Sequence, residues 1–385
     1  MAFDLDAALQ TARDMGASDP HVKVPAVPRV RIDGELVEMP GYARVTLEDA
    51  DRVREQVVPT TSVKRRLLDE RGSADLSYFI GAGRFRVAAF MQRNCPSFVF
   101  RSIPKAPDAE TLGLPLVLSS WADEQRGLVL VTGPTGSGKS TTCAALLDLV
   151  NERRRCHILT IEDLIEFLHP DKRALVCQRE LGDDAPNYHE ALRAALRQDP
   201  DVILVGEIRD EETAMTVLRA AETGHLVLST MHTLDAAETV QRFVDLLGGR
   251  ADLARQMLAG TLVGVSSQRL MPGTSGGRVL AAEVLVNSAR MRDLIAEGAP
   301  QAELTRTVAA GEYYGMQTFD QDLLDHVRAG RVDRETAIAH ASSAHDFKLL
   351  LMSAGVDEVG TLRRAEAMQP LPGPEREPNP PPYAA

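Results

Sequence analysis

The chain has 385 residues, which is too long for one small hydrophobic core and predicts two domains. Its formal net charge of -12 and its pI of 5.3 argue against a constitutive nucleic-acid-binding protein, which usually presents a basic face. No apolar run approaches the roughly 20 residues that cross a bilayer, so we expect a cytoplasmic protein without direct membrane insertion.

Residues 1–105 are predicted to form an N-terminal α/β domain. An opening helix precedes the segment "PRVRIDGELVEM", in which Asp33 and Gly34 indicate the turn of a hairpin. A helical stretch is expected at 47–70, and two further strands are expected within "GRFRVAAFMQ" and "SFVFRSI". Alternation along the first of these strands places its two arginines on one face of the sheet.

The pattern changes after a Pro-rich linker at 106–115. Within 116–350, the aliphatic runs "GLVLVTG", "HILTIED", "ALVCQRE", "DVILVGE" and "HLVLSTMH" alternate with helical segments. Strands that are apolar on both faces, each followed by a helix, indicate a parallel sheet covered on both sides. A helical part is expected at about 290–350. The C-terminal extension at 351–385 is Pro-rich, and we expect it to be disordered from about residue 368.

The segment "GPTGSGKSTT" matches the phosphate-binding pattern GxxxxGK[ST]. It lies between a strand-like run and a helix, which is where a phosphate loop needs to be. Its glycines allow backbone N–H groups to surround phosphate oxygens, Lys139 can reach the β- and γ-phosphates, and Ser140 can ligate Mg²⁺. The residues predicted to bind ATP are Gly133, Pro134, Thr135, Gly136, Ser137, Gly138, Lys139, Ser140 and Thr141.

Acidic and histidine side chains stand next to the other predicted strands. Ligands of an open parallel sheet bind beyond the carboxyl ends of its strands, so these side chains are candidates for contact with Mg²⁺ and phosphate. In chain order they are Glu162, Asp163, Glu166, Glu207, His225 and His232. For Glu162 and Asp163, a helix cap or a solvated loop is an equally good interpretation. A structural role is an equally good interpretation for His225.

Four ordered segments together resemble the type IV pilus retraction ATPases of the PilT/PilU group, which are secretion-type hexameric ATPases. These segments are "GPTGSGKSTT", "ILTIEDLIEF", "LRQDPDVILVGEIRDEET" and "AAETGHLVLSTMHT". The resemblance implies an N-terminal PAS-like α/β domain followed by a RecA-like ATPase domain. It also implies a homohexamer that uses ATP and Mg²⁺ and acts at the inner membrane through a pilus platform protein.

The resemblance assigns roles to individual positions. Glu166 corresponds to the glutamate that activates water, and Glu207 to the Walker B glutamate associated with Mg²⁺. His225 and His232 correspond to the His-box pair. Three arginines match residues of the N-terminal domain that approach the nucleotide phosphates: Arg84, Arg86 and Arg101. Judged from the residues alone, these arginines fit a solvated sheet face.

Two segments depart from the family pattern. Leu164 stands where the family usually has proline, and the retraction motif appears as "RMRDLIAE", with Asp293 and Ala296 replacing Asn and Arg. These two departures favour an accessory PilU-like retraction ATPase, and so do the segments "FRVAAFMQRN" and "AIAHASSAHDFKLLL", which resemble that branch. Such a protein could act with a paralogous retraction ATPase.

Three alternatives to this accessory role remain. One is a principal PilT-type retraction ATPase, and another is a nucleotide-binding regulatory subunit of a partner ATPase. The third is a pilus-extension or type II secretion ATPase, although the four-cysteine zinc insertion common in those relatives is missing from this sequence.

Overall fold

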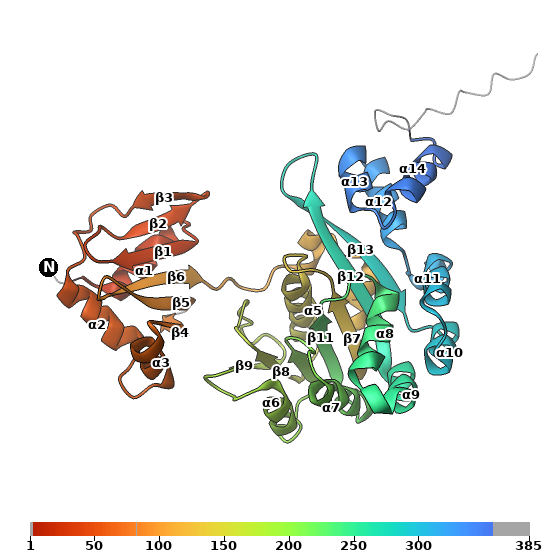
Figure 1. The fold of residues 1–385 in the computed structure, drawn as a ribbon, viewed down its shortest axis with the longest axis horizontal. Coiled ribbons are helices and arrows are strands. Elements are labelled where there is room, and N and C mark those ends of the chain that lie inside the picture. Colours follow the sequence, from red (N-terminus) through yellow and green to blue (C-terminus); the bar gives the residue numbers. More distant parts are fainter. Residues whose placement is uncertain (1–2, 82, 357–385) are drawn as a thin grey trace, which may run out of the picture.

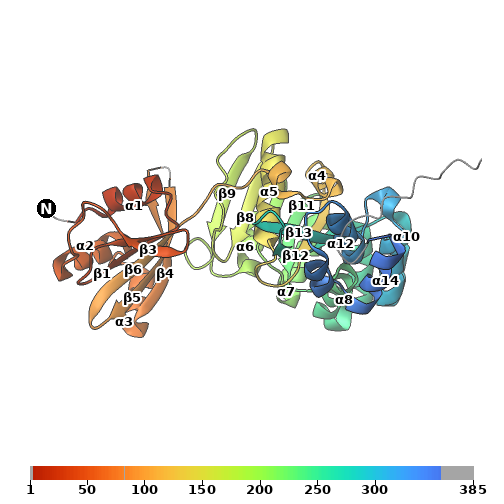
Figure 2. The ribbon, with the colours of Figure 1, turned by 90° about the horizontal axis from the view of Figure 1, so that it is seen from above.

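Two α/β units, each built around its own sheet, follow one another along the chain and lie side by side in space (Figure 1). The computed structural model describes residues 3–81 and 83–356. The view from above shows β8 and β9 at the edge of the second unit that faces the first (Figure 2). Within the described residues, no helix is both long enough and apolar enough to cross a bilayer.

The N-terminal unit is an antiparallel six-stranded sheet with the strand order β3-β2-β1-β6-β5-β4. Its elements are α1 (Leu5–Asp14), β1 (Asp19–Lys23), β2 (Arg29–Ile32), β3 (Glu35–Glu38), α2 (Leu47–Val57), α3 (Val63–Arg71), β4 (Ser73–Ile80), β5 (Gly83–Gln92) and β6 (Cys95–Ser102).

The predicted hairpin is confirmed, because β2 and β3 pair across a turn in which Asp33 has φ 48° and Gly34 has φ 87°. Positive φ at both central residues is the geometry of a two-residue hairpin turn, which favours Asp-Gly. The predicted helical stretch is divided into α2 and α3, whose N-termini are capped by Thr46 and Ser62. The sequence did not predict β1 and β4.

The core of this unit lies on one face of β5. Phe85 and Val87 are buried there, and Phe85 meets Phe100 of β6 edge-on with 6.4 Å between ring centroids. Arg84 and Arg86 alternate with these apolar residues and lie on the other face, as the sequence predicted. The alternation therefore presents both arginines away from the core of their own unit.

The second unit is built on a seven-stranded sheet with the order β13-β12-β7-β11-β10-β8-β9. All strands except the antiparallel edge strand β13 are parallel. Its elements, which follow the short helix η1 (Ala109–Leu112), are α4 (Leu116–Trp121), β7 (Gly127–Thr132), α5 (Lys139–Arg153), β8 (His157–Glu162), β9 (Leu175–Glu180), α6 (Tyr188–Ala195), β10 (Val202–Val205), α7 (Glu211–Glu222), β11 (Leu226–Met231), α8 (Ala236–Leu246), η2 (Gly248–Arg250), α9 (Ala251–Thr261), β12 (Leu262–Pro272) and β13 (Arg278–Val286).

Helices cover both faces of this sheet, as expected for strands that are apolar throughout. Every residue of β7 is buried: Leu128 and Leu130 face the cluster formed with α6 to α9, whereas Val129 and Val131 face α4 and α5. The strands predicted from aliphatic runs are all present, and β12 and β13 were not predicted.

The predicted helical C-terminal part is also present. Its helices are α10 (Ala289–Glu297), α11 (Gln301–Ala309), η3 (Glu312–Tyr314), α12 (Phe319–Arg328), α13 (Arg334–His340) and α14 (Ala344–Ser353). The disorder predicted from about residue 368 concerns a segment that lies outside the described residues.

Candidate active site

The phosphate-binding loop connects β7 to α5, and its backbone conformation requires glycine. Gly138 precedes α5 with φ 92°, and Gly133 leaves β7 with φ 137°. A Cβ atom on Gly133 would lie 2.4 Å from the carbonyl oxygen of Gln268, which a side chain cannot tolerate. The loop therefore ends at the N-terminus of a helix, where backbone N–H groups and the helix dipole favour an anion.

Among the described residues, Lys139 has no ion-pair partner and the hydroxyl of Ser137 has no hydrogen-bond partner. The ammonium of Lys139 donates to the carbonyl oxygens of Gly133 at 2.8 Å and Pro134 at 3.1 Å, and burial lowers its pKa. The hydroxyl of Ser137 is buried, and no group in the described part of the chain hydrogen-bonds to it. A cation held at a helix N-terminus beside an unpaired hydroxyl fits a polyphosphate ligand.

Glu166 lies in the loop after β8 and reaches the start of α5. The hydroxyl of Ser140 donates to its Oε1 atom at 3.0 Å. A serine hydroxyl at this place in a phosphate loop is a Mg²⁺ ligand, and a neighbouring carboxylate can bind the water that a metal retains. The residues present therefore fit a nucleotide with Mg²⁺.

Glu207 and His232 follow the carboxyl ends of β10 and β11 and contact each other. The Nε2 atom of His232 lies 3.2 Å from Oε2 of Glu207, and Arg209 lies 2.5 Å from Oε1. Only 9% of Glu207 is exposed. Its carboxylate is therefore held by two partners at the edge of the sheet that carries the phosphate loop.

Glu162 is the last residue of β8 and is almost fully buried. Its Oε1 atom accepts hydrogen bonds from Thr160 at 2.6 Å and from Gln178 at 3.3 Å. Burial raises the pKa of this carboxyl to about 7. Asp163, the next residue, donates its backbone N–H to the hydroxyl of Tyr188 at 3.0 Å.

These groups surround one cavity of about 480 Å³ beyond the carboxyl ends of the parallel strands. The predicted residues that line it are Arg86, Thr135, Gly136, Gly138, Lys139, Ser140, Thr141, Glu162, Asp163, Glu166, Glu207 and His232. Gly133, Pro134 and Ser137 belong to the phosphate loop without lining the cavity. A single arginine of the N-terminal unit thus lines the same cavity as the phosphate loop.

Three predicted residues lie elsewhere. His225 precedes β11, at the opposite edge of the sheet from His232, and its Nδ1 atom is 3.0 Å from the carbonyl oxygen of Ala220. Arg84 binds the carboxylate of Glu180 at 2.8 Å. Arg101 pairs at 2.7 Å with Asp19 within the N-terminal unit. In this structure none of the three lines the cavity.

A family model for type II/IV secretion system proteins matches residues 4–339. The chain belongs to this family. It is 42% identical over 351 residues to the type IV pilus retraction ATPase PilT of Pseudomonas aeruginosa, covering 90% of this chain and 100% of the relative. It is 35% identical over 357 residues to the type IV pilus ATPase PilU of the same organism, covering 91% of each chain.

A solved structure of the pilus retraction motor PilT with bound ADP superposes with a TM-score of 0.81. Its sequence is 39% identical, and the match covers 90% of this chain and 99% of that one. These similarities confirm the predicted family, the ATPase class, and the fold of an N-terminal domain followed by a RecA-like domain.

Below the phosphate loop of this secretion-family chain lies a row of buried hydroxyls, which we call the hydroxyl row. Thr132 at the end of β7 contacts Ser267 at 2.7 Å and Thr239 at 3.2 Å. Thr239 in turn contacts Thr233 at 2.6 Å. Thr239 donates its one hydroxyl proton to the carbonyl oxygen of Asp235 at 2.7 Å, so it accepts from Thr132 and Thr233, and Thr132 accepts from Ser267. The row joins β7, α8 and β12 beneath the site.

Several cavity residues of this family member were not predicted from the sequence. Arg209 stands two positions after Glu207 in "GEIRDEET", and its place in that motif could have indicated it. Tyr188 begins α6, and Arg278 begins the unpredicted strand β13, so no motif marks either residue.

Proposed function

We propose that this protein is an ATP-hydrolysing motor that powers type IV pilus retraction. The observation that carries the proposal is the contact between Glu166 and Ser140 at 3.0 Å, in the cavity that also holds Lys139 and Glu207. A carboxylate beside the metal-binding serine of a phosphate loop suits a water-activating group. The similarity to the relative named a type IV pilus retraction ATPase supports the type IV pilus as the structure on which the motor acts.

The phosphates of ATP would lie on the loop from Gly133 to Thr141, with Lys139 leaving its loop carbonyls to bind the β- and γ-phosphate oxygens. Ser140, and Glu207 through water, would hold Mg²⁺. When bound, this ion withdraws charge from the phosphate oxygens. His232 and Arg209 fix the direction of the Glu207 carboxylate, because both contact its oxygens.

Glu166 would orient the attacking water and accept its proton, which is the role of a general base. Arg86 would stabilise the negative charge that develops on the transferred phosphoryl group. It comes from β5 of the N-terminal unit but lines the same cavity as the phosphate loop. Closure of the N-terminal unit on the bound nucleotide would then convert nucleotide binding into rigid-body movement between the subunits of the ring.

The motor would work as a homohexamer on the cytoplasmic side of the inner membrane and bind a platform protein of the pilus machinery. Support comes from the extent of the similarity to PilT, which spans the whole length of that relative. Measuring the mass of the purified protein with and without ATP tests this assembly. A protein that stays monomeric at micromolar concentration with ATP would contradict it.

An accessory, PilU-like role is the second candidate. Leu164 and the sequence "RMRDLIAE" favour it, whereas the higher identity to PilT (42%) than to PilU (35%) favours the principal motor. A strain that lacks this gene separates the two candidates. Loss of all retraction supports the principal motor, and weakened retraction under load supports the accessory one.

Replacing Glu166 by glutamine tests the proposed chemistry. The purified Glu166→Gln protein should bind ATP and lose about 10²- to 10⁴-fold in kcat, the usual contribution of a general base. Glu152→Gln, on the outer surface of α5, is the matched control. Turnover of Glu166→Gln at the wild-type rate would refute the assignment. In cells, the Glu166→Gln strain should accumulate surface pili, and a strain without pili would indicate extension instead.

A further inference from the structure

Glu180, the last residue of β9, is a buried carboxylate outside the predicted site. Only 1% of its side chain is exposed. A buried charge is unfavourable unless hydrogen bonds and an opposite charge compensate it. The contacts that compensate Glu180 come from two different parts of the chain.

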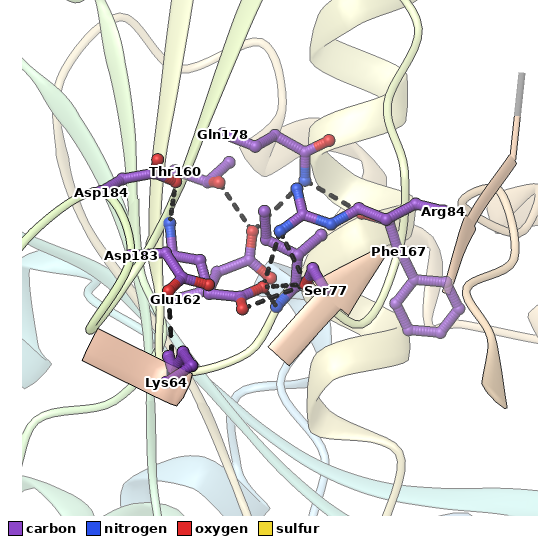
Figure 3. Close-up of polar contacts among 11 residues, drawn as sticks. Lys64, Ser77, Arg84, Thr160, Glu162, Phe167, Gln178, Asp183 and Asp184 are labelled. Carbon is purple, nitrogen blue, oxygen red and sulfur yellow. Dashed lines mark hydrogen bonds and ion pairs between the residues drawn. The ribbon is translucent and has the colours of Figure 1, made fainter. Parts of the chain in front are cut away.

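The first set of contacts comes from the N-terminal unit (Figure 3). Arg84 of β5 binds Oε2 of Glu180 at 2.8 Å, and the hydroxyl of Ser77 of β4 donates to the two carboxylate oxygens at 3.1 and 3.2 Å. Arg84 also donates to the hydroxyl of Ser77 at 3.0 Å. The carboxylate of Glu180, in the second unit, is therefore the point at which two strands of the N-terminal unit dock.

The second contact comes from the loop that carries Glu166. The backbone N–H of Ile165 donates to Oε2 of Glu180 at 3.2 Å, which is the oxygen that Arg84 also binds. Ile165 is itself buried, and the residue after it supplies the carboxylate that meets Ser140. A single oxygen atom thus joins the N-terminal unit to the backbone next to Glu166.

Other bonds fix the same loop on the far side of Glu166. Gln178 of β9 donates to the carbonyl of Phe167 at 2.9 Å and accepts from the N–H of His169 at 3.0 Å. Leu168 donates its N–H to the carbonyl of Pro104, two residues after the end of β6, at 2.9 Å. With these bonds in place, Glu180 is the anchor on the near side of Glu166, and its bond to Arg84 connects that anchor to β5 of the N-terminal sheet.

We propose that Glu180 is a positioning residue that couples docking of the N-terminal unit, through Arg84 and Ser77, to the placement of Glu166. This inference rests on the proposed function, in which Glu166 activates water. When Arg84 is bound, the carboxylate is held where it accepts from Ile165. When the N-terminal unit withdraws, Glu180 loses its cation and its seryl partner, and the loop loses a fixed acceptor.

Kinetics of ATP hydrolysis test this coupling. Glu180→Gln keeps the shape of the side chain and loses the charge that binds Arg84. We expect a fall in kcat of about 10- to 10²-fold, the effect of a displacement on the order of 1 Å, with KM for ATP unchanged. Arg84→Ala should produce the same loss, and the double variant should lose no more than either single variant, because both act through one contact.

Lys64 and Asp183 provide a matched control. They form another ion pair between the two units, at 3.7 Å, but neither contacts the loop of Glu166. Lys64→Ala should retain the wild-type kcat. An equal loss in Lys64→Ala would mean that docking in general matters, and it would overturn the specific role of Glu180. Additive losses in Arg84→Ala and Glu180→Gln would also overturn it, because Arg84 would then act on the nucleotide directly.

Hydrogen exchange gives a readout that needs no turnover. The amide of Ile165 should exchange faster in Glu180→Gln and in Arg84→Ala than in the wild type, and at the wild-type rate in Lys64→Ala. If the amide of Ile165 exchanged at the wild-type rate in both Glu180→Gln and Arg84→Ala, the proposal would be overturned, whatever the ATPase activity. If the wild-type protein hydrolyses no ATP but the three variants show this exchange pattern, the proposed function is refuted and the coupling is still supported. Thermal unfolding confirms that each variant is folded.

Discussion

Replacing Glu162 by glutamine tests how deeply the wall of the cavity is buried. Burial raises the pKa of the Glu162 carboxyl from 4.5 to about 7. Each pKa unit corresponds to about 1.4 kcal/mol, so ionising this side chain costs roughly 3 kcal/mol more in the folded chain than in the unfolded chain. Below pH 4.5 the Glu162 carboxyl is protonated in both the folded and the unfolded chain, so its burial does not lower the stability of the wild type. Because the pKa is higher in the folded chain, the free energy of unfolding of the wild type falls as the pH rises from 4.5 through about 7.

Glu162→Gln does not ionise and avoids that loss. Its free energy of unfolding, relative to wild type, should therefore increase by roughly 2 kcal/mol between about pH 5 and about pH 8. Urea unfolding of the nucleotide-free protein measures this difference through the fluorescence of Trp121, the single tryptophan, which is buried in the same unit. Glu48→Gln is the control, since that side chain is 84% exposed. A difference that stays constant with pH would refute the burial argument.

Two further pairs of variants test the placement of other residues. Arg86→Ala should weaken binding of a fluorescent, non-hydrolysable ATP analogue, and Arg101→Ala should not, because Arg86 lines the cavity and Arg101 does not; equal losses would contradict this placement. Gly264→Ala should destabilise the protein by about 1–3 kcal/mol in thermal unfolding, because its Cβ would lie 2.4 Å from the ring of Trp121. Gly260→Ala, which meets nothing within 4 Å, should not destabilise it, and equal stability of both variants would contradict the close packing.

The parallel strands could be predicted because runs of aliphatic residues mark strands that are buried on both faces. The strands that were not predicted lack this mark. β12 contains Ser266, Ser267 and Gln268, each fully buried, and the last two satisfy their polar atoms with hydrogen bonds to neighbouring hydroxyls. β1 begins with Asp19 and Pro20, which are rare in strands. Residues distant in sequence stabilise these polar strands. The local sequence pattern does not show those partners, so it does not predict the strands.

The phosphate loop and the carboxylates at strand ends were predictable for a geometric reason: parallel strands bring their carboxyl ends to one edge. The same geometry separates His225 from His232, since the strand between them is six residues long and carries them to opposite edges. Gln178 and Glu180 could not be identified from the sequence. Their importance depends on the loop of Glu166 folding back over β9, and β9 carries no recognisable motif.

The hydroxyl row beneath the phosphate loop has a consequence for how the site responds to charge. Thr239 has one hydroxyl proton and gives it to the carbonyl oxygen of Asp235 at 2.7 Å, so the bonds of the row all point toward Thr239. Their direction cannot reverse unless the bond to Asp235 breaks. The row therefore presents the same polarity to the phosphate loop with and without an anion, and the response to charge is left to the groups that line the cavity, Lys139 first among them.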